Sequence, residues 1–399
     1  MSQSTLSPTG NQTQTYDYGV VILRIVNLRE LTTPSAVVDL DRLERNAAWM
    51  TNRATKLGVC LRPHVKTHKC VEAAKLQTAG QTKRLTVSTL AEAQEFATAG
   101  FDDITYAVSL SPKAVPECAR LTRTVKRFNV IVDHPVAVDA LEAYAHTHDL
   151  RFSVFLKVDC GLHRAGVDPD SPEAVTLAGR LHRSSRMNFR GILTHAGQSY
   201  SCRNRSEAAN VAAHERDTMV TFAAKLRGEG LTVAEISIGS TPTITAVDRL
   251  PGISEIRPGN YLFFDAFQTA IGSCVLEDVA FSVLTTVVGA YPDAQRLVVD
   301  AGALALSKDP GPTHVDPDCG FGVVVTEHDC RPVPGLRVTS LSQEHGVLHS
   351  DGPLDPAWRP GTRFRIVPNH SCLAAACHDR YHVVRGTEVV DKWRPVRGW

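Results

Sequence analysis

The sequence contains no uninterrupted apolar run of the about 18 residues that a membrane-spanning helix requires. Lysine plus arginine (43) almost equals aspartate plus glutamate (42), the formal net charge is +1, and no basic block stands out. This balance gives no field that would attract nucleic acid or an anionic membrane. No Gly-x-Gly-x-x-Gly follows a strand-like run, which disfavours a dinucleotide-binding fold. With 43% apolar and 21% charged residues, the chain has the composition of an ordinary globular protein.

The sequence also lacks a dense cysteine framework, although it has ten cysteines. They are scattered through 399 residues. The first 18 residues, MSQSTLSPTGNQTQTYDY, are polar and lack the basic-then-apolar order of an export signal. This pattern indicates reduced thiols and a cytoplasmic location. We interpret residues 1–32 as a polar tail followed by a strand, near Val20, that joins a β domain.

Short β-rich runs alternate with helical periods from about Ser35 to Phe264. The run SAVVDL, for example, is followed by apolar residues spaced by threes and fours, as on one face of a helix. About eight such units predict an α/β fold with a (β/α)8 barrel over residues 33–270, rather than an open doubly wound sheet. From about Ile271 the pattern changes to short β runs separated by turns. Residues 271–399 are therefore predicted to form an antiparallel β domain.

Polar clusters follow five of the predicted strands at their carboxyl ends. Active sites of barrel enzymes lie at this end, where the loops leave the strands. The sequence therefore predicts one site built from several distant segments. Its candidate residues are His64, Lys66 and His68; Asp159, His163 and Arg164; Thr194, His195, Gln198 and Tyr200; Gly239, Ser240 and Thr241; and Arg257, Gly259 and Asn260.

Two glycine turns and one lysine are consistent with a phosphate-bearing carbonyl cofactor. SIGSTPT (237–243) and RPGNY (257–261) offer backbone N–H groups and hydroxyls to a phosphate, although a simple helix cap explains the first turn equally well. Lys66 lies in LRPHVKTHKC between His64 and His68. Partial burial beside such groups lowers a lysine pKa and favours attack on an aldehyde. The alternative is a solvated lysine beside Lys69.

The segment PNHSC places His370 and Cys372 two residues apart. On a strand, this spacing points both side chains to one face, where imidazole and thiolate share a metal. A buried cysteine beside an incidental histidine is the alternative. Two protein ligands would leave coordination positions open for water or substrate, which is typical of a catalytic metal site.

Seven motifs, taken in order, resemble the D-serine dehydratase and D-threonine aldolase family of fold-type III pyridoxal-phosphate enzymes, whose barrel is related to that of alanine racemase. They are TPSAVVDLDRLERNAAWM, RPHVKTHK, VDCGLHRAGV, THAGQSY, SIGSTPT, IRPGNYLFFD and PNHSC. The resemblance extends from Thr33 almost to the C-terminus. It implies that Lys66 forms a Schiff base with pyridoxal 5'-phosphate. It also implies a homodimer.

The resemblance assigns roles to further residues. It implies that the glycine turns hold the cofactor phosphate, that His163 and Arg164 lie around the pyridine ring, and that Tyr200 is a further cofactor contact. In this interpretation His64 and His68 shape the surroundings of Lys66. The residues of the two turns are Gly239, Ser240, Thr241, Gly259, Asn260 and Tyr261.

The metal motif separates the branches of the family. Aldolases of the family carry His-x-Asp and dehydratases carry His-x-Cys, which this chain has at His370 and Cys372. Thiolate favours Zn2+, and carboxylate favours Mn2+ or Mg2+. The resemblance therefore implies a zinc-dependent dehydratase that converts a D-3-hydroxy amino acid, such as D-serine, to a 2-oxo acid and ammonia. Retro-aldol cleavage is the main alternative. A racemase leaves the metal pair unexplained, and a non-catalytic cofactor carrier leaves the β domain unexplained.

Overall fold

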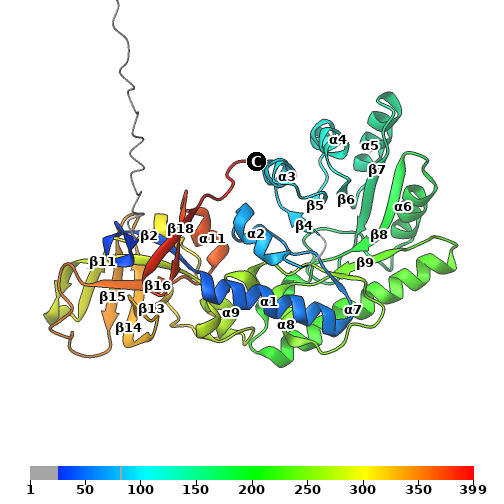
Figure 1. The fold of residues 1–399 in the computed structure, drawn as a ribbon. Helices are drawn as coiled ribbons and strands as arrows, with labels where there is room; N and C mark the ends of the chain where they lie inside the picture. Colours follow the sequence, from blue (N-terminus) through cyan, green and yellow to red (C-terminus); the bar gives the residue numbers. More distant parts are fainter. Residues whose placement is uncertain (1–25, 81–82) are drawn as a thin grey trace, which may run out of the picture.

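The computed structural model describes residues 26–80 and 83–399, and the larger of its two units is a barrel of eight parallel strands (Figure 1). The neighbours follow the order β3-β10-β9-β8-β7-β6-β5-β4. This arrangement confirms the predicted fold class. The strands are β3 (Cys60–Leu61), β4 (Arg84–Val87), β5 (Asp103–Ser109), β6 (Arg127–Val132), β7 (Phe152–Lys157), β8 (Met187–Leu193), β9 (Glu235–Ile238) and β10 (Glu255–Ile256).

The barrel closes between β3 and β4 through a short bridge. His64 pairs with Thr86 in a parallel bridge. On either side of it, the Val65 N–H donates to the Thr86 carbonyl at 2.9 Å, and the Thr86 N–H donates to the Pro63 carbonyl at 2.9 Å. The closure therefore fixes the chain immediately before Lys66 against the neighbouring strand.

Helices cover the outside of the barrel, and the apolar spacing seen in the sequence faces inward. In α1 the buried apolar residues are Leu43, Ala47, Met50 and Ala54, which recur at intervals of three and four. This helix ends at Gly58, whose φ of 68° is a left-handed conformation that glycine adopts without strain. The helices are α1 (Leu40–Leu57), α2 (Val71–Gln77), α3 (Leu90–Thr98), α4 (Val115–Thr124), α5 (Pro135–Thr147), α6 (Pro172–Arg183), α7 (Arg205–Gly228) and α8 (Thr241–Ala246).

The second unit is the expected β domain, drawn beside the barrel in Figure 1. Because β11 pairs with both β12 and β16, six of its ten strands close into a ring. The short helix α11 (Ser371–Ala376) lies on the side that faces the barrel (Figure 1). The strands are β1 (Val26–Asn27), β2 (Ser35–Asp39), β11 (Phe281–Tyr291), β12 (Arg296–Val299), β13 (Val323–Thr326), β14 (Pro332–Leu341), β15 (Gly346–Ser350), β16 (Arg363–Val367), β17 (Tyr381–Arg385) and β18 (Glu388–Trp393).

Two strand assignments differ from the sequence prediction. Residues 35–39 were expected to open the barrel, but β2 lies in the β domain, antiparallel to β11 and parallel to β17. An alternation of strand and helix identifies βα units without saying which sheet each strand joins. The eighth barrel strand is instead β10. The strand expected near Val20 lies mostly outside the described residues; its end, β1, pairs with β18. No helix of the described residues is long and apolar enough to cross a membrane.

A buried ion network lies inside the barrel. The guanidinium of Arg62, which is fully buried, donates from Nε to Glu255 Oε2 at 2.7 Å and from Nη1 to Asp103 Oδ1 at 2.7 Å. These contacts tie the end of β3 to β10 and β5. Removing one member of a buried ion network leaves the others charged and unpaired, which costs more than the pair itself contributes.

Arg62→Met is therefore expected to lower the free energy of unfolding by about 3–5 kcal/mol, because it leaves the buried carboxylate of Glu255 without its ion-pair partner, whereas Asp103 keeps Arg84 and Arg127. Denaturant unfolding followed by circular dichroism measures this. The control is Arg120→Met, since Arg120 and Glu117 form an exposed pair, and its effect should stay below about 1 kcal/mol. Equal losses in the two variants would contradict a structural role for the network.

Candidate active site

All eight barrel strands contribute to one cavity of about 380 Å³ at their carboxyl ends. Five of these segments were predicted, and β4, β5 and β6 add Ser88, the stretch 107–109 and Ile131. The remaining lining residues are His64, Lys66, Lys157, Arg164, Ala165, Leu193, His195, Tyr200, Gly239, Ser240, Thr241, Arg257, Gly259 and Asn260. The volume is that of a small-molecule site.

The cavity is cationic. Lys66, Lys157, Arg164 and Arg257 line it, and no carboxylate of the described residues does. Burial, together with the charges of Arg164 and Arg257, lowers the pKa of Lys157. Such a lining favours ligands that carry phosphate and carboxylate groups. Lys157 was missed from the sequence, although a lysine that ends a fully buried strand is itself an unusual feature.

The turn that carries Lys66 is held by both units. The Tyr381 hydroxyl donates to the His68 carbonyl at 3.0 Å, and the Val396 N–H donates to the Lys69 carbonyl at 2.7 Å. The Lys69 ammonium pairs with Glu92 at 2.7 Å. Lys69 therefore points away from the cavity, and Lys66 is the lysine of this motif that lines it.

His68 braces the same turn as a neutral side chain. It is fully buried, its Nε2 lies 2.9 Å from Gln77 Oε1, and its Nδ1 accepts the Cys70 N–H at 3.0 Å. These partners assign the proton to Nε2, because Nδ1 acts as an acceptor. Burial lowers the pKa of His68 to about 4. His68 therefore shapes the surroundings of Lys66, as the sequence indicated.

Two more histidines, His64 and His195, lie in the cavity. Burial lowers the pKa of each well below the usual value, and the positive charges of Lys66 and Arg257 lower it further. Both rings are thus neutral near pH 7. A neutral imidazole adds no further positive charge beside the amine of Lys66, and it can contact an aromatic cofactor ring.

The two glycine turns come together at one side of the cavity. At Gly239 the φ is 105°, and an added Cβ would lie 2.9 Å from the Ile244 side chain. At Gly259 an added Cβ would lie 2.6 Å from the His64 carbonyl oxygen. The Tyr261 N–H donates to the Thr241 hydroxyl at 3.1 Å and so joins the turns. Both positions accept only glycine because neighbouring atoms approach the backbone closely.

The other residues of these turns divide between the lining and its support. Ser240 caps α8, with its hydroxyl accepting the Thr243 N–H at 3.3 Å, so the helix-cap interpretation of the turn also holds. Tyr261 is fully buried outside the lining. Asn260 lines the cavity, and its buried Oδ1 has no partner among the described residues. The cationic lining fits a cofactor phosphate, whereas the orphaned amide oxygen of Asn260 requires a hydrogen-bond donor, which an ionised phosphate does not supply.

Glu215 supports the loops from behind and was not predicted. This residue of α7 is fully buried, and its Oε1 accepts the N–H of Ala196 at 3.2 Å and of Gly239 at 3.0 Å. One carboxylate therefore ties the loop after β8 to the loop after β9. Nothing in the amphipathic pattern of α7 distinguishes this glutamate from its exposed neighbours in the sequence.

His163 does not reach the cavity. Its side chain is 85% exposed, and its Nδ1 lies 3.2 Å from Asp159 Oδ2. Its backbone has a φ of 56°, a left-handed conformation that turns the chain back towards Asp159. The neighbouring Arg164 does line the cavity. The structure thus places only one of these two residues where a cofactor ring would lie.

Tyr200 lines the cavity on the side of the metal pair. Burial raises the pKa of its hydroxyl, and the charges of Cys372 and Asp265 add to the rise. Its ring lies 5.8 Å, between centroids, from the ring of Phe267, in the short helix α9 (Ala266–Ala270). The hydroxyl is therefore protonated at neutral pH and is available as a hydrogen-bond donor.

His370 and Cys372 lie together, but not on a strand as expected. His370 is the extended N-cap residue of α11, and Cys372 lies in the first turn of this helix. The alanines that follow favour helix over strand. Asp309 Oδ2 lies 3.1 Å from His370 Nδ1, which leaves the other ring nitrogen, Nε2, for Cys372 or for a metal. Among the described residues no cluster of three or more metal-ligating side chains occurs.

The pair has the electronic character of a metal site. Burial alone would lower the pKa of His370, but the neighbouring Cys372 sulfur and the Asp309 carboxylate outweigh burial and raise it to about 11. Conversely, burial raises the pKa of Cys372, but the charge and hydrogen bond of His370 bring it below the usual value. The neighbouring imidazole thus favours the thiolate form of Cys372, which is the form that binds zinc.

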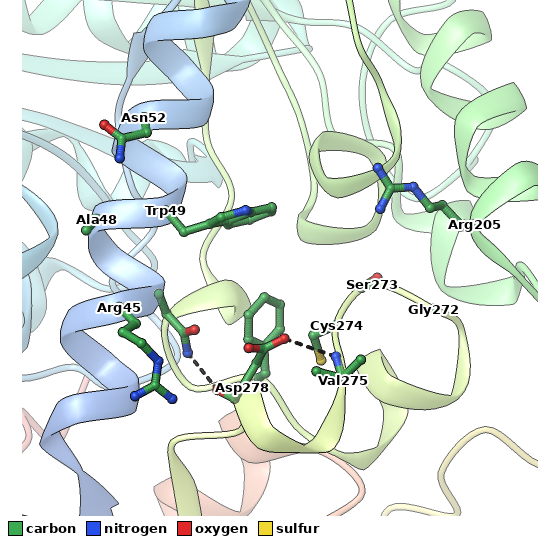
Figure 2. Close-up of a pocket in the computed structure, with 12 residues that line it drawn as sticks. Arg45, Ala48, Trp49, Asn52, Arg205, Gly272, Ser273, Cys274, Val275 and Asp278 are labelled. Atoms are coloured by element: carbon green, nitrogen blue, oxygen red, sulfur yellow. Dashed lines mark hydrogen bonds between the residues drawn. The ribbon is translucent and has the colours of Figure 1, made fainter.

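A larger cavity, of about 770 Å³, lies elsewhere, between α1 and the segment 272–278 (Figure 2). Trp49 projects into it from α1, and Arg205 faces it from the start of α7 (Figure 2). Asp278 accepts the Val275 N–H at 3.1 Å. This cavity contains none of the predicted site residues, so volume alone does not identify the active site.

A parallel barrel with a lysine in a cationic cavity at its strand ends, joined to a β domain, defines an alanine racemase-like barrel enzyme. The family model "Alanine racemase, N-terminal domain" matches residues 38–266, and the model "Putative serine dehydratase domain" matches residues 280–384. The chain belongs to the family of D-serine dehydratases and D-threonine aldolases, lyases of fold type III that depend on pyridoxal phosphate.

Three similar proteins illustrate the range of the family. D-threo-3-hydroxyaspartate dehydratase of Delftia sp. (strain HT23) is 41% identical over 93% of this chain and 99% of its own. Its structure superposes with a TM-score of 0.88 over 94% of this chain and 100% of that one, and a variant has been solved in a metal-free form. D-serine dehydratase of Dictyostelium discoideum is 36% identical over 94% of this chain and 98% of its own. The structure of D-threonine aldolase from Filomicrobium marinum is 27% identical in sequence and superposes with a TM-score of 0.81 over 93% of this chain and 97% of that one.

The neutral state of His68 predicts a pH dependence of stability. The pKa is about 4 in the folded protein and about 6.5 in an unfolded chain, so the unfolded state takes up the proton first as the pH falls. The advantage of the wild type over His68→Gln in free energy of unfolding is therefore expected to shrink by about 3 kcal/mol between pH 7 and pH 4. Denaturant unfolding at several pH values measures it. Parallel pH profiles for the two proteins would contradict the neutral assignment.

Proposed function

We propose that the protein is a pyridoxal-phosphate- and zinc-dependent dehydratase that eliminates water from a D-3-hydroxy amino acid. One contact carries the proposal. The hydroxyl of Thr67, the residue after Lys66, lies 3.1 Å from Cys372 Sγ. The segment that carries Lys66 therefore lies next to the His370–Cys372 pair, although neither member of the pair lines the cavity itself.

The residues present fit pyridoxal phosphate. Lys66 Nζ would anchor its aldehyde, and the turns at Gly239–Thr241 and Gly259–Asn260 would hold its phosphate. Arg164, His64 and His195 would contact its ring. When bound, the cofactor supplies an electron sink that stabilises negative charge at the substrate α-carbon.

Lys66 would have a second role, as a base, when its amine is free. Its free amine is placed to accept the α-proton at Nζ. The neutral rings of His64 and His195 lie beside it without adding charge. The cationic residues Lys157, Arg164 and Arg257 favour binding of the substrate as a carboxylate.

His370 and Cys372 would hold the zinc ion, with Asp309 orienting the imidazole. A site with two protein ligands leaves room for a substrate oxygen, and zinc there supplies Lewis acidity towards the β-hydroxyl. Loss of the α-proton and of the β-hydroxyl as water leaves an enamine. Its imine tautomer takes up one water molecule and yields the 2-oxo acid and ammonia, so the overall reaction balances.

The substrate is proposed to be D-threo-3-hydroxyaspartate or D-serine, the substrates in the names of the two most similar relatives described above. A cavity with four cations and no carboxylate suits a dicarboxylate as well as a monocarboxylate. The alternative is retro-aldol cleavage to glycine and an aldehyde, as the aldolase relatives suggest, with Mn2+ or Mg2+. The thiolate of Cys372 favours zinc and therefore dehydration.

A homodimer in the cytoplasm completes the proposal. The resemblance to the family supports the dimer, and the ten unpaired cysteines are consistent with a reducing compartment. Analytical ultracentrifugation of the purified protein tests the dimer directly.

Product analysis tests the reaction. Purified protein with pyridoxal phosphate and zinc should give ammonia and pyruvate from D-serine, or ammonia and oxaloacetate from D-threo-3-hydroxyaspartate. Cys372→Ala should lower zinc content and reduce elimination at least about 100-fold, because the variant lacks one of two protein ligands. Glycine and an aldehyde as main products would establish the aldolase instead. Full activity after chelation would remove zinc from the scheme.

A comparison of two lysines tests the cofactor assignment. Lys66→Ala should abolish the visible absorbance of covalently attached cofactor and lower the rate of elimination at least about 1,000-fold, since anchor and base are lost together. Lys157→Met is the matched control, because Lys157 lines the same cavity and also has a lowered pKa. It should retain the attachment. The reverse pattern would identify Lys157 as the anchor.

A further inference from the structure

Asp265 lies between the two halves of the candidate site and has no role in the scheme above. It follows the turn that contains Asn260 and is the N-cap residue of α9, where its Oδ1 accepts the Gln268 N–H at 2.9 Å. The residue is 1% exposed. A carboxylate this deeply buried is rare unless several donors satisfy it.

The second carboxylate oxygen joins the cofactor turn to the metal pair. Asp265 Oδ2 accepts Asn260 Nδ2 at 2.7 Å, the Ser371 N–H at 3.0 Å and the Ser371 hydroxyl at 3.2 Å. Asn260 lines the cavity. Ser371 is the residue between His370 and Cys372. One oxygen atom therefore fixes both segments at once.

Further contacts restrict the movement of the Asn260 turn relative to α11. Asn260 Nδ2 also lies 3.1 Å from the Ser371 hydroxyl and 3.8 Å from Cys372 Sγ. The first N–H groups of α9 donate to the segment before the metal pair, from Ala266 to the Pro368 carbonyl at 3.1 Å and from Phe267 to the Asn369 carbonyl at 3.1 Å. A displacement of Asn260 must therefore move α11 or break a charge-assisted hydrogen bond.

We infer that Asp265 is a positioning residue that couples cofactor binding at Asn260 to metal binding at His370 and Cys372. The inference rests on the proposed function, because it takes pyridoxal phosphate and zinc as the two ligands. A bound phosphate would fix the Asn260 turn in the orientation that also fixes Ser371. Each ligand then strengthens the binding of the other by the same factor, as thermodynamic linkage requires.

Zinc affinity measured with and without cofactor tests the inference. A chelating dye competes for zinc with the full-length protein, once free of pyridoxal phosphate and once loaded with it. In the wild type, cofactor should tighten zinc binding on the order of tenfold, and zinc should tighten cofactor binding equally. In Asp265→Asn the ratio of the zinc affinities with and without cofactor should fall to about 1, because an amide N–H would then face the donors of Asn260 and Ser371.

Asp278→Asn is the matched control. Asp278 is an aspartate of the segment that follows α9, and its carboxylate accepts one backbone N–H, from Val275, and lines the other cavity (Figure 2). This variant should keep the wild-type factor. If thermal unfolding shows that Asp265→Asn does not fold, Asn260→Ala replaces it. That variant keeps the bonds from Asp265 to Ser371 but loses the contacts of Asn260 with Ser371 and Cys372, so its zinc affinity without cofactor serves as its own baseline, and the ratio of the affinities with and without cofactor should fall to about 1.

Three results would overturn the inference. A wild-type factor of 1, with both ligands bound and elimination dependent on both, would reject the coupling and leave the proposed function intact. A wild-type factor retained in Asp265→Asn, or in Asn260→Ala, would show that the coupling runs elsewhere. Absence of zinc binding to the wild type would reject the inference together with the metal part of the proposed function.

Discussion

Hydrogen bonds hold the turn from Val65 to Lys69 from two sides, and the geometry of the site depends on them. On the barrel side, Val65 donates to the carbonyl of Thr86, where the barrel closes. On the side of the β domain, Tyr381 and Val396 donate to the carbonyls of His68 and Lys69. The backbone around Lys66 is thus fixed by hydrogen bonds to two separate units before any ligand binds. An amine that acts first as the anchor of a cofactor and then as a base needs a backbone held in one position.

Burial and charge then divide the ionisable groups of this region into two sets. Burial keeps His64, His68 and His195 neutral. For His64 and His195, neighbouring cations also favour the neutral form. His370 and Cys372 instead stabilise each other as a charged pair, with Asp309 behind the imidazole. The same residue type is therefore a neutral support in the barrel and, in the proposed function, a metal ligand in the β domain. Environment rather than identity decides the role.

Most of the fold and the centre of the site could be predicted from the sequence. The βα alternation predicted the barrel, and the rule that sites lie at strand ends selected Lys66, Arg164, Tyr200 and both glycine turns, which all contribute to the lining of the cavity. Periodicity could not say that Ser35–Asp39 pairs with β11 and β17, because pairing partners are non-local. It also placed His370 and Cys372 on a strand, where a run of alanines continues the chain as a helix.

The supporting residues could not be predicted for a different reason. Glu215 is a mid-helix glutamate outside the seven motifs, and Asp265 ends the motif IRPGNYLFFD, in which the sequence assigned it no role. Their roles come from burial and from backbone donors contributed by loops far away in the sequence. Conversely, His163 belongs to one of the quoted motifs, yet its left-handed backbone conformation directs its side chain towards solvent.

The placement of the two chemistries explains how one scaffold serves both elimination and retro-aldol cleavage. In the proposed function, the lysine and the turns that would hold the phosphate belong to the barrel, whereas the residues that would bind the metal belong to a short helix of the other unit. The chemistry at the α-carbon can therefore stay constant while the metal site changes. Because Thr67 touches Cys372, a change of ligand at position 372 acts next to Lys66 without altering the barrel. In the proposed function, the choice between loss of the β-hydroxyl and cleavage of the carbon–carbon bond depends on what the metal would hold at the β-position, and on how firmly Asp265 holds α11 against the turn that contains Asn260.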